Sequence, residues 1–112
     1  MGAFAKGSVI LIPFPFSDLS QAKMRPAVVL AGVENQDYIL CQVTSKPYAD
    51  RMAVKIEEND FEKGSLRLVS YARPTKLFTA NEDLFFSCVG KLSEAKSHEI
   101  VETIVQILTK SF

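Results

Sequence analysis

Two side chains at junctions between apolar runs and polar segments are the best candidates for chemistry in this sequence. Arg25 precedes Pro26 and the apolar run 27–31, and Thr44 follows the apolar run 38–43. A guanidinium group stays protonated and binds two phosphate oxygens, and a threonine hydroxyl can donate a hydrogen bond to the same phosphate. Such a pair could stabilise charge on a phosphoryl group if a rigid scaffold holds it.

Groups for other kinds of catalysis are scarce. The single histidine, His98, falls within a predicted helix, and Cys41 and Cys88 lie in apolar runs, where a free cysteine packs as a small hydrophobe. This composition provides neither a zinc ligand set nor a base for a serine or cysteine nucleophile. The acidic residues from Glu57 to Glu62 are more typical of a solvated turn than of an oxygen cage. We therefore expect no metal and no cofactor.

RNA cleavage remains open to such a site, because RNA carries its own nucleophile in the 2′-hydroxyl group. A formal net charge of +0 argues against a nucleic-acid partner. However, residues 19–33, 38–49 and 63–81 contain no acid, and their basic residues are Lys23, Arg25, Lys46, Lys63, Arg67, Arg73 and Lys76. If these windows converge, they form a basic cleft. The alternative is that these basic residues fall in the three windows by chance in a small chain.

Apolar runs rich in β-branched residues predict short strands at 8–12, 27–31, 38–44, 52–56, 66–71 and 84–89. We expect Pro13 and Pro15 to end the first strand, and a polar loop to span Ser17 to Met24. Pro26 favours extended geometry at Arg25, where the chain would re-enter the sheet.

From Ser93 onward, apolar residues recur at helical spacing and predict an amphipathic closing helix. Residues 1–112 are thus expected to form one mostly β (α+β) domain, a small SH3-like antiparallel barrel with the helix packed on it. The sequence has no apolar run of about 18 residues and no readable leader. We expect a cytoplasmic protein without membrane contact.

The segments VILIPFPFSDL and MRPAVVL resemble the opening hairpin of the PemK/MazF toxins, the endoribonuclease components of bacterial type II toxin–antitoxin pairs. The similarity continues through CQVTS, SYARPTKLFT and the VGKLS turn into the final helix. It covers nearly the whole chain. The RPxxVL element after an aromatic-proline strand, combined with the VTS step, is what makes the resemblance specific.

This resemblance implies a CcdB/MazF-like barrel, a homodimer, metal-independent and sequence-specific cleavage of single-stranded RNA, and neutralisation by a cognate antitoxin. By motif position, Arg25 would stabilise the phosphorane and protonate the 5′-oxygen leaving group, while Thr44 would orient the phosphate. The residues expected to contact the RNA are Ser17, Lys23, Ser45, Lys46, Arg73 and Lys76.

Alternatives remain at this stage. A CcdB-like toxin binds gyrase through terminal aromatic residues, and this chain ends in Phe112, but such a toxin does not need the Arg25 and Thr44 pair. An inactive member could instead serve as a DNA- or antitoxin-binding regulatory module. Phe14 and Phe16 could stack on RNA bases, although packing in the core or at a dimer contact is favoured for aromatic residues in an apolar strand.

Overall fold

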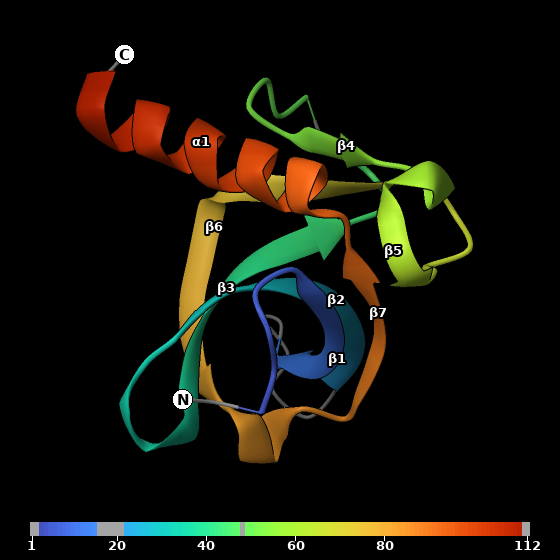
Figure 1. The fold of residues 1–112 in the computed structure, drawn as a ribbon, viewed down its shortest axis with the longest axis vertical. Helices are drawn as coiled ribbons and strands as arrows, with labels where there is room; N and C mark the ends of the chain where they lie inside the picture. The colour runs from blue at the N-terminus through green and yellow to red at the C-terminus, as the bar shows by residue number, and fades with distance from the viewer. Residues whose placement is uncertain (1–2, 16–21, 48, 111–112) are drawn as a thin grey trace.

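The chain forms an antiparallel sheet that curls into a half-barrel, with a helix lying across its outside (Figure 1). The structure is a computed structural model and describes residues 3–15, 22–47 and 49–110. The strands are β1 (Ser8–Pro15), β2 (Ala22–Gly32), β3 (Asp37–Thr44), β4 (Val54–Ile56), β5 (Phe61–Gly64), β6 (Ser70–Asn81) and β7 (Ser87–Leu92), and the helix is α1 (Glu94–Lys110). The order across the sheet is β4-β6-β3-β2-β1-β7-β5. The predicted barrel with a closing helix is confirmed.

The first hairpin is longer than the sequence indicated. Strand β1 continues through both prolines, because Pro13 pairs with Met24 and Pro15 pairs with Ala22. On its other side, β1 pairs with β7 only as far as Leu11. Beyond that point the strand has a neighbour on one side, a position in which a residue without an N–H is tolerated. The expected end of the strand at Pro13 was therefore wrong.

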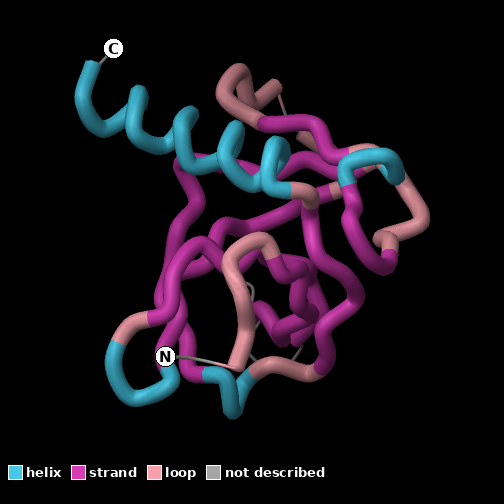
Figure 2. The backbone as a smooth tube through the Cα atoms, in the orientation of Figure 1, coloured by secondary structure: helices cyan, strands magenta, loops and turns pink. Residues whose placement is uncertain are grey.

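Alternating residues of the central strands fill two apolar clusters on opposite faces of the sheet. On one face, Val9, Val28 and Val43 pack with Ile100 and Ile104 of α1. The other face holds a second cluster of Ile10, Ile12, Ala27, Val29, Tyr38, Leu40 and Ala80, joined by Phe4, Phe14, Phe78 and Phe85. Figure 2 shows the strands curling around the interior while α1 stays outside. Both faces of β1 and β2 are thereby buried, which fixes the position of this hairpin.

Three later strands begin after their expected first residues. The strand expected at 52–56 begins at Val54. The strand expected at 66–71 begins only at Ser70. The strand expected at 84–89 begins at Ser87, because the Asn81 side chain accepts a hydrogen bond from the Asp83 N–H (3.0 Å) and starts a 3₁₀ turn. As a result Phe86 is 68% exposed. Cys88, expected in the core, is also exposed.

The helix begins as predicted, with the Ser93 hydroxyl accepting a hydrogen bond from the Lys96 N–H (3.2 Å). The helix crosses over β6 with β4 beside it (Figure 1). Its last turns extend past the sheet, so Leu108 is 75% exposed although its helical spacing matches that of the core residues.

The Lys96 ammonium group joins the helix to the edge strand β4. Its Nζ donates to the Lys55 carbonyl of β4 (3.0 Å) and to the Glu99 carboxylate (2.8 Å). It also lies 3.8 Å from the Asp60 carboxylate. One side chain therefore connects α1, β4 and the turn that follows β4.

Candidate functional site

The three acid-free windows of the sequence fall largely on adjacent strands. Strands β6, β3 and β2 are neighbours in the sheet, and they carry or precede the basic residues Lys23, Arg25, Lys46, Arg73 and Lys76. Lys63 belongs to β5, and Arg67 lies in the segment before β6. The fold thus collects most of the basic residues of these windows on one part of the sheet.

Arg25 lies inside β2 instead of at its start. Strand β2 begins at Ala22, and Arg25 pairs with Ile12 of β1. The loop expected to reach Met24 is therefore shorter, because cross-strand pairing continues to the end of β1. The β2–β3 ladder pairs Val28 with Cys41 and Ala27 with Gln42. The regular pairing ends at Ala27 and Gln42. Extended by two residues, this register would place Arg25 opposite Thr44, on the same face.

Thr44 ends β3, as predicted, and is 4% exposed. Its hydroxyl oxygen accepts a hydrogen bond from the Lys46 N–H (3.1 Å), which fixes the side chain at the point where the chain leaves the sheet. This bond uses an acceptor lone pair, and the hydroxyl proton is a separate donor. On its other side Thr44 pairs with Tyr71 of β6. The arrangement suits a donor held in place for an oxyanion.

Arg73, expected to contact RNA, forms an ion pair with Asp50. The Arg73 Nε lies 3.0 Å from the Asp50 carboxylate, and the two side chains are 19% and 8% exposed. Sequence reasoning missed Asp50, which lies just outside an acid-free window and 23 residues from Arg73. The local signal is a turn residue after Pro47, but the pairing itself depends on the fold.

The other expected RNA contacts have different surroundings. Lys23 is exposed on β2, opposite Phe14 of β1. Ser45 and Lys46 are exposed in the turn after Thr44, and Lys76 is exposed on β6. Phe16 and Ser17 lie outside the described residues.

The Phe14 ring packs edge-on against the Phe78 ring, with centroids 4.9 Å apart. Packing is therefore its role in the structure, as the sequence favoured.

Cys41 lies behind the site and is fully buried. Burial raises the pKa of the Cys41 thiol to about 12, a hydrogen bond from the Arg73 backbone opposes this rise, and the charge of Asp50 adds to it. The neutral thiol donates a hydrogen bond to the Arg73 carbonyl (3.3 Å). The thiol is thus neutral at physiological pH and packs as a core group, not as a nucleophile.

Because the Cys41 thiol is buried, we expect the protein to lose stability at alkaline pH. The folded thiol ionises near pH 12 and the unfolded thiol near pH 9, so the unfolded state binds fewer protons between these values. The free energy of unfolding therefore falls as pH rises through this window. Relative to Cys41→Val, the wild type is expected to lose about 1.4 kcal/mol per pH unit above about pH 9. Urea unfolding of both proteins measures this, and a pH-independent difference would contradict it.

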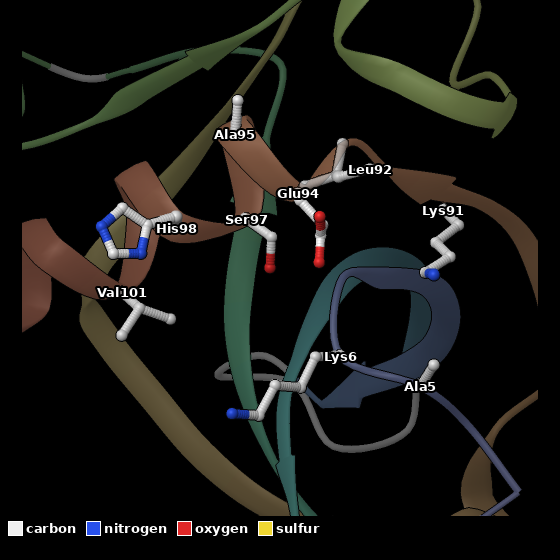
Figure 3. Close-up of a pocket in the computed structure, with 9 residues that line it drawn as sticks. All are labelled: Ala5, Lys6, Lys91, Leu92, Glu94, Ala95, Ser97, His98 and Val101. Carbon is white, nitrogen blue, oxygen red and sulfur yellow. The ribbon is translucent and has the colours of Figure 1, made fainter.

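A separate hollow of about 660 Å³ lies between the start of α1 and the segment that precedes β1 (Figure 3). Its polar lining comes from Lys6, Lys91, Glu94, Ser97 and His98 and includes charges of both signs. It adjoins the beginning of β1, whereas Arg25 pairs with Ile12 further along that strand. Of the expected site residues that the structure describes, none lines this hollow.

Within the described ranges, no group of three or more histidine, cysteine or acidic side chains is arranged to hold a metal ion. Among the residues that the structure describes, no helix is both long enough and apolar enough to cross a membrane.

Comparisons with known proteins agree on one family. A family model of PemK-like, MazF-like toxins of type II toxin-antitoxin systems matches residues 5–108. No curated protein matches the chain.

Solved structures resemble the whole fold at low identity. A mycobacterial endoribonuclease in complex with its cognate antitoxin gives a TM-score of 0.72 at 15% identity, covering 100% of this chain and 99% of the other. MazF from a MazE–MazF complex of Deinococcus radiodurans gives 0.75 at 14% identity, with 99% and 100% covered. A Mycobacterium tuberculosis MazF toxin gives 0.71 at 12% identity, with 94% and 99% covered.

Proposed function

Since this chain belongs to the PemK-like, MazF-like toxins of type II toxin-antitoxin systems, we propose that it is a metal-independent, sequence-specific endoribonuclease that cleaves single-stranded RNA. The observation that carries the proposal is the position of Arg25 on β2 and of Thr44 at the end of the neighbouring strand β3, beyond the last pair of the β2–β3 ladder. Basic residues of β2 and β6, and Lys46 just after β3, supply positive charge for a phosphate backbone.

The proposed reaction uses the RNA 2′-oxygen as the nucleophile. A bond forms between this oxygen and phosphorus, the bond from phosphorus to the 5′-oxygen breaks, and the 2′-hydroxyl proton passes to solvent. Arg25 stabilises the phosphorane and gives a proton to the 5′-oxygen, while the Thr44 hydroxyl orients the phosphate. Arg25 regains a proton from solvent. The products are an RNA end with a 2′,3′-cyclic phosphate, which water can open to a 3′-phosphate, and an RNA end with a 5′-hydroxyl.

We also propose that the toxin is a homodimer. Leu11 pairs with Pro26 and Pro13 pairs with Met24, so these four apolar residues share one face of the β1–β2 hairpin. Phe86 lies beside them, with its N–H donating to the Leu11 carbonyl (2.8 Å). Met24 and Phe86 are both exposed in the single chain. An apolar surface of this kind supports association with a second copy.

The proposed partner is a cognate antitoxin that neutralises the toxin in the cytoplasm. Two of the similar structures are toxins determined in complexes with antitoxins, from a mycobacterial species and from Deinococcus radiodurans. An acidic, initially disordered antitoxin segment would match the basic residues of β2 and β6 and Lys46 after β3.

Chelation of metals tests the proposed chemistry. The pure protein, incubated in EDTA with a long single-stranded transcript, is expected to cut it at the same sites and rate as without EDTA, because the groups proposed to act on the phosphate are side chains of the protein. Mapping of the ends should show 5′-hydroxyl groups. Absence of cleavage, or cleavage that appears only after Mg²⁺ is added, would refute the proposal.

A further inference from the structure

Asp50 is an acidic residue at the basic end of the sheet, close to where the proposed function places RNA phosphates. A carboxylate there repels the substrate and weakens RNA binding. Its side chain is nevertheless 8% exposed and engaged at both oxygens. These contacts point to a task other than binding RNA.

One set of Asp50 contacts holds the segment that follows Thr44. The Asp50 carboxylate accepts a hydrogen bond from the Met52 N–H (2.9 Å). The Asp50 N–H donates to the Pro47 carbonyl (2.8 Å), and its own carbonyl accepts from the Ala53 N–H (3.3 Å). Asp50 thus joins Pro47 to Met52 and Ala53, after the turn that begins at the Thr44 hydroxyl.

The other Asp50 contact orients Arg73. The second carboxylate oxygen accepts from Arg73 Nε at 3.0 Å. Strand β6 is irregular here, because its pairing with β3 shifts between Cys41 and Val43, from Leu77 to Ala72. The Arg73 carbonyl in this bulge accepts a hydrogen bond from the buried Cys41 thiol (3.3 Å). Arg73 is therefore held at its backbone by β3 and at its side chain by Asp50.

We propose that Asp50 is a positioning residue of the ribonuclease: its carboxylate fixes the Arg73 guanidinium relative to Thr44, so that both meet the same RNA strand. The inference rests on the proposed function. It predicts that the negative charge costs RNA affinity and supports turnover. If Asp50 were only a charge near the RNA, its removal would tighten binding and leave turnover unchanged; as a positioning residue, its removal lowers turnover.

Asp50→Asn tests this directly, because asparagine keeps an oxygen for the Met52 N–H and loses the ion pair. With a short RNA containing the mapped cleavage site, kcat is expected to fall about ten- to a hundredfold, the scale of a misplacement of about 1 Å. The Kd for the same oligonucleotide with a 2′-O-methyl group at the cleavage site is expected to stay equal or to tighten. Asp50→Glu, which keeps the charge, is expected to restore part of kcat.

A double-mutant cycle then separates positioning from a general loss of structure. If Asp50 acts through Arg73, Asp50→Asn should have almost no further effect on kcat in an Arg73→Met background. Asp60→Asn is the matched control: Asp60 also accepts a backbone N–H, from Glu57, and lies near a lysine, but on the far side of β4. It should leave kcat unchanged.

The outcomes distinguish a failure of the proposed function from a failure of the positioning role of Asp50. If the wild type does not cut RNA, the proposed function fails. If it does, the positioning role is overturned by an unchanged kcat in Asp50→Asn, by additive effects in the double variant, or by an equal loss in Asp60→Asn. A thermal unfolding measurement on each variant should show that it unfolds only above the assay temperature. The measured kcat then refers to folded protein.

Discussion

Replacement of Arg25 by alanine is expected to lower kcat for RNA cleavage by about a thousandfold, since one charged group both stabilises the phosphorane and protonates the leaving oxygen. Loss of a single oxyanion donor alone typically costs about a hundred- to a thousandfold. Arg25→Lys keeps the charge and loses the planar fork, so an intermediate kcat is expected. Single-turnover cleavage of a mapped RNA site measures both.

Lys23→Ala provides the matched control for Arg25→Ala. Lys23 lies on the same strand two residues earlier, is exposed and carries the same charge. Loss of Lys23 should weaken RNA binding and reduce the salt dependence of this binding, while kcat stays nearly unchanged. Equal losses in the two variants would reduce Arg25 to a general phosphate-binding charge. In cells, Arg25→Ala should also abolish growth arrest, whereas a gyrase-binding toxin would keep it.

Gly64→Ala is expected to lower the free energy of unfolding by about 3 kcal/mol, through two additive causes. Gly64 has a φ of +69°, where a residue with a Cβ is strained, and an added Cβ would lie 2.2 Å from the Val89 carbonyl oxygen. That atom belongs to the backbone of β7, the pairing partner of β5, so it cannot move without disturbing the ladder.

Gly7→Ala is the corresponding control, because Gly7 also has a positive φ (+88°), but an added Cβ there would come no closer than 3.4 Å to its neighbours. Only the conformational cost should remain, about 1–2 kcal/mol. Urea unfolding of both variants gives the comparison. Equal losses would show that the close approach of β5 and β7 relaxes without cost.

The sequence predicted the type of most elements because their causes are local. Strand β3 ends at Thr44 and the helix is capped by Ser93, both as expected. The wrong predictions concern strand bounds that depend on pairing with another strand or on a side-chain hydrogen bond. Strand β1 runs through Pro13 because β2 continues to pair with it, and the final strand starts at Ser87 because the Asn81 side chain favours a turn. Neither effect is visible in local propensity.

In the candidate site, too, the features with local causes were predicted and those that depend on the fold were not. Arg25 and Thr44 carry recognisable motifs, but their approach depends on the register of β2 against β3. The ion pair of Arg73 with Asp50 requires an irregular β6 and a folded segment after β3. Leu108 continues the helical spacing of the buried Ile100 and Ile104, yet it is exposed because the helix extends past the sheet.

The bond from Lys96 to the Lys55 carbonyl also bears on how this protein meets other chains. Strand β4 is an edge of the sheet, and an edge with unpaired carbonyl groups is a template for adding a foreign strand and for aggregation. Here a helix side chain occupies one of those acceptors, and the charged neighbours Glu99 and Asp60 flank it. Uncontrolled strand addition at β4 is therefore disfavoured, which directs association toward other surfaces of the molecule.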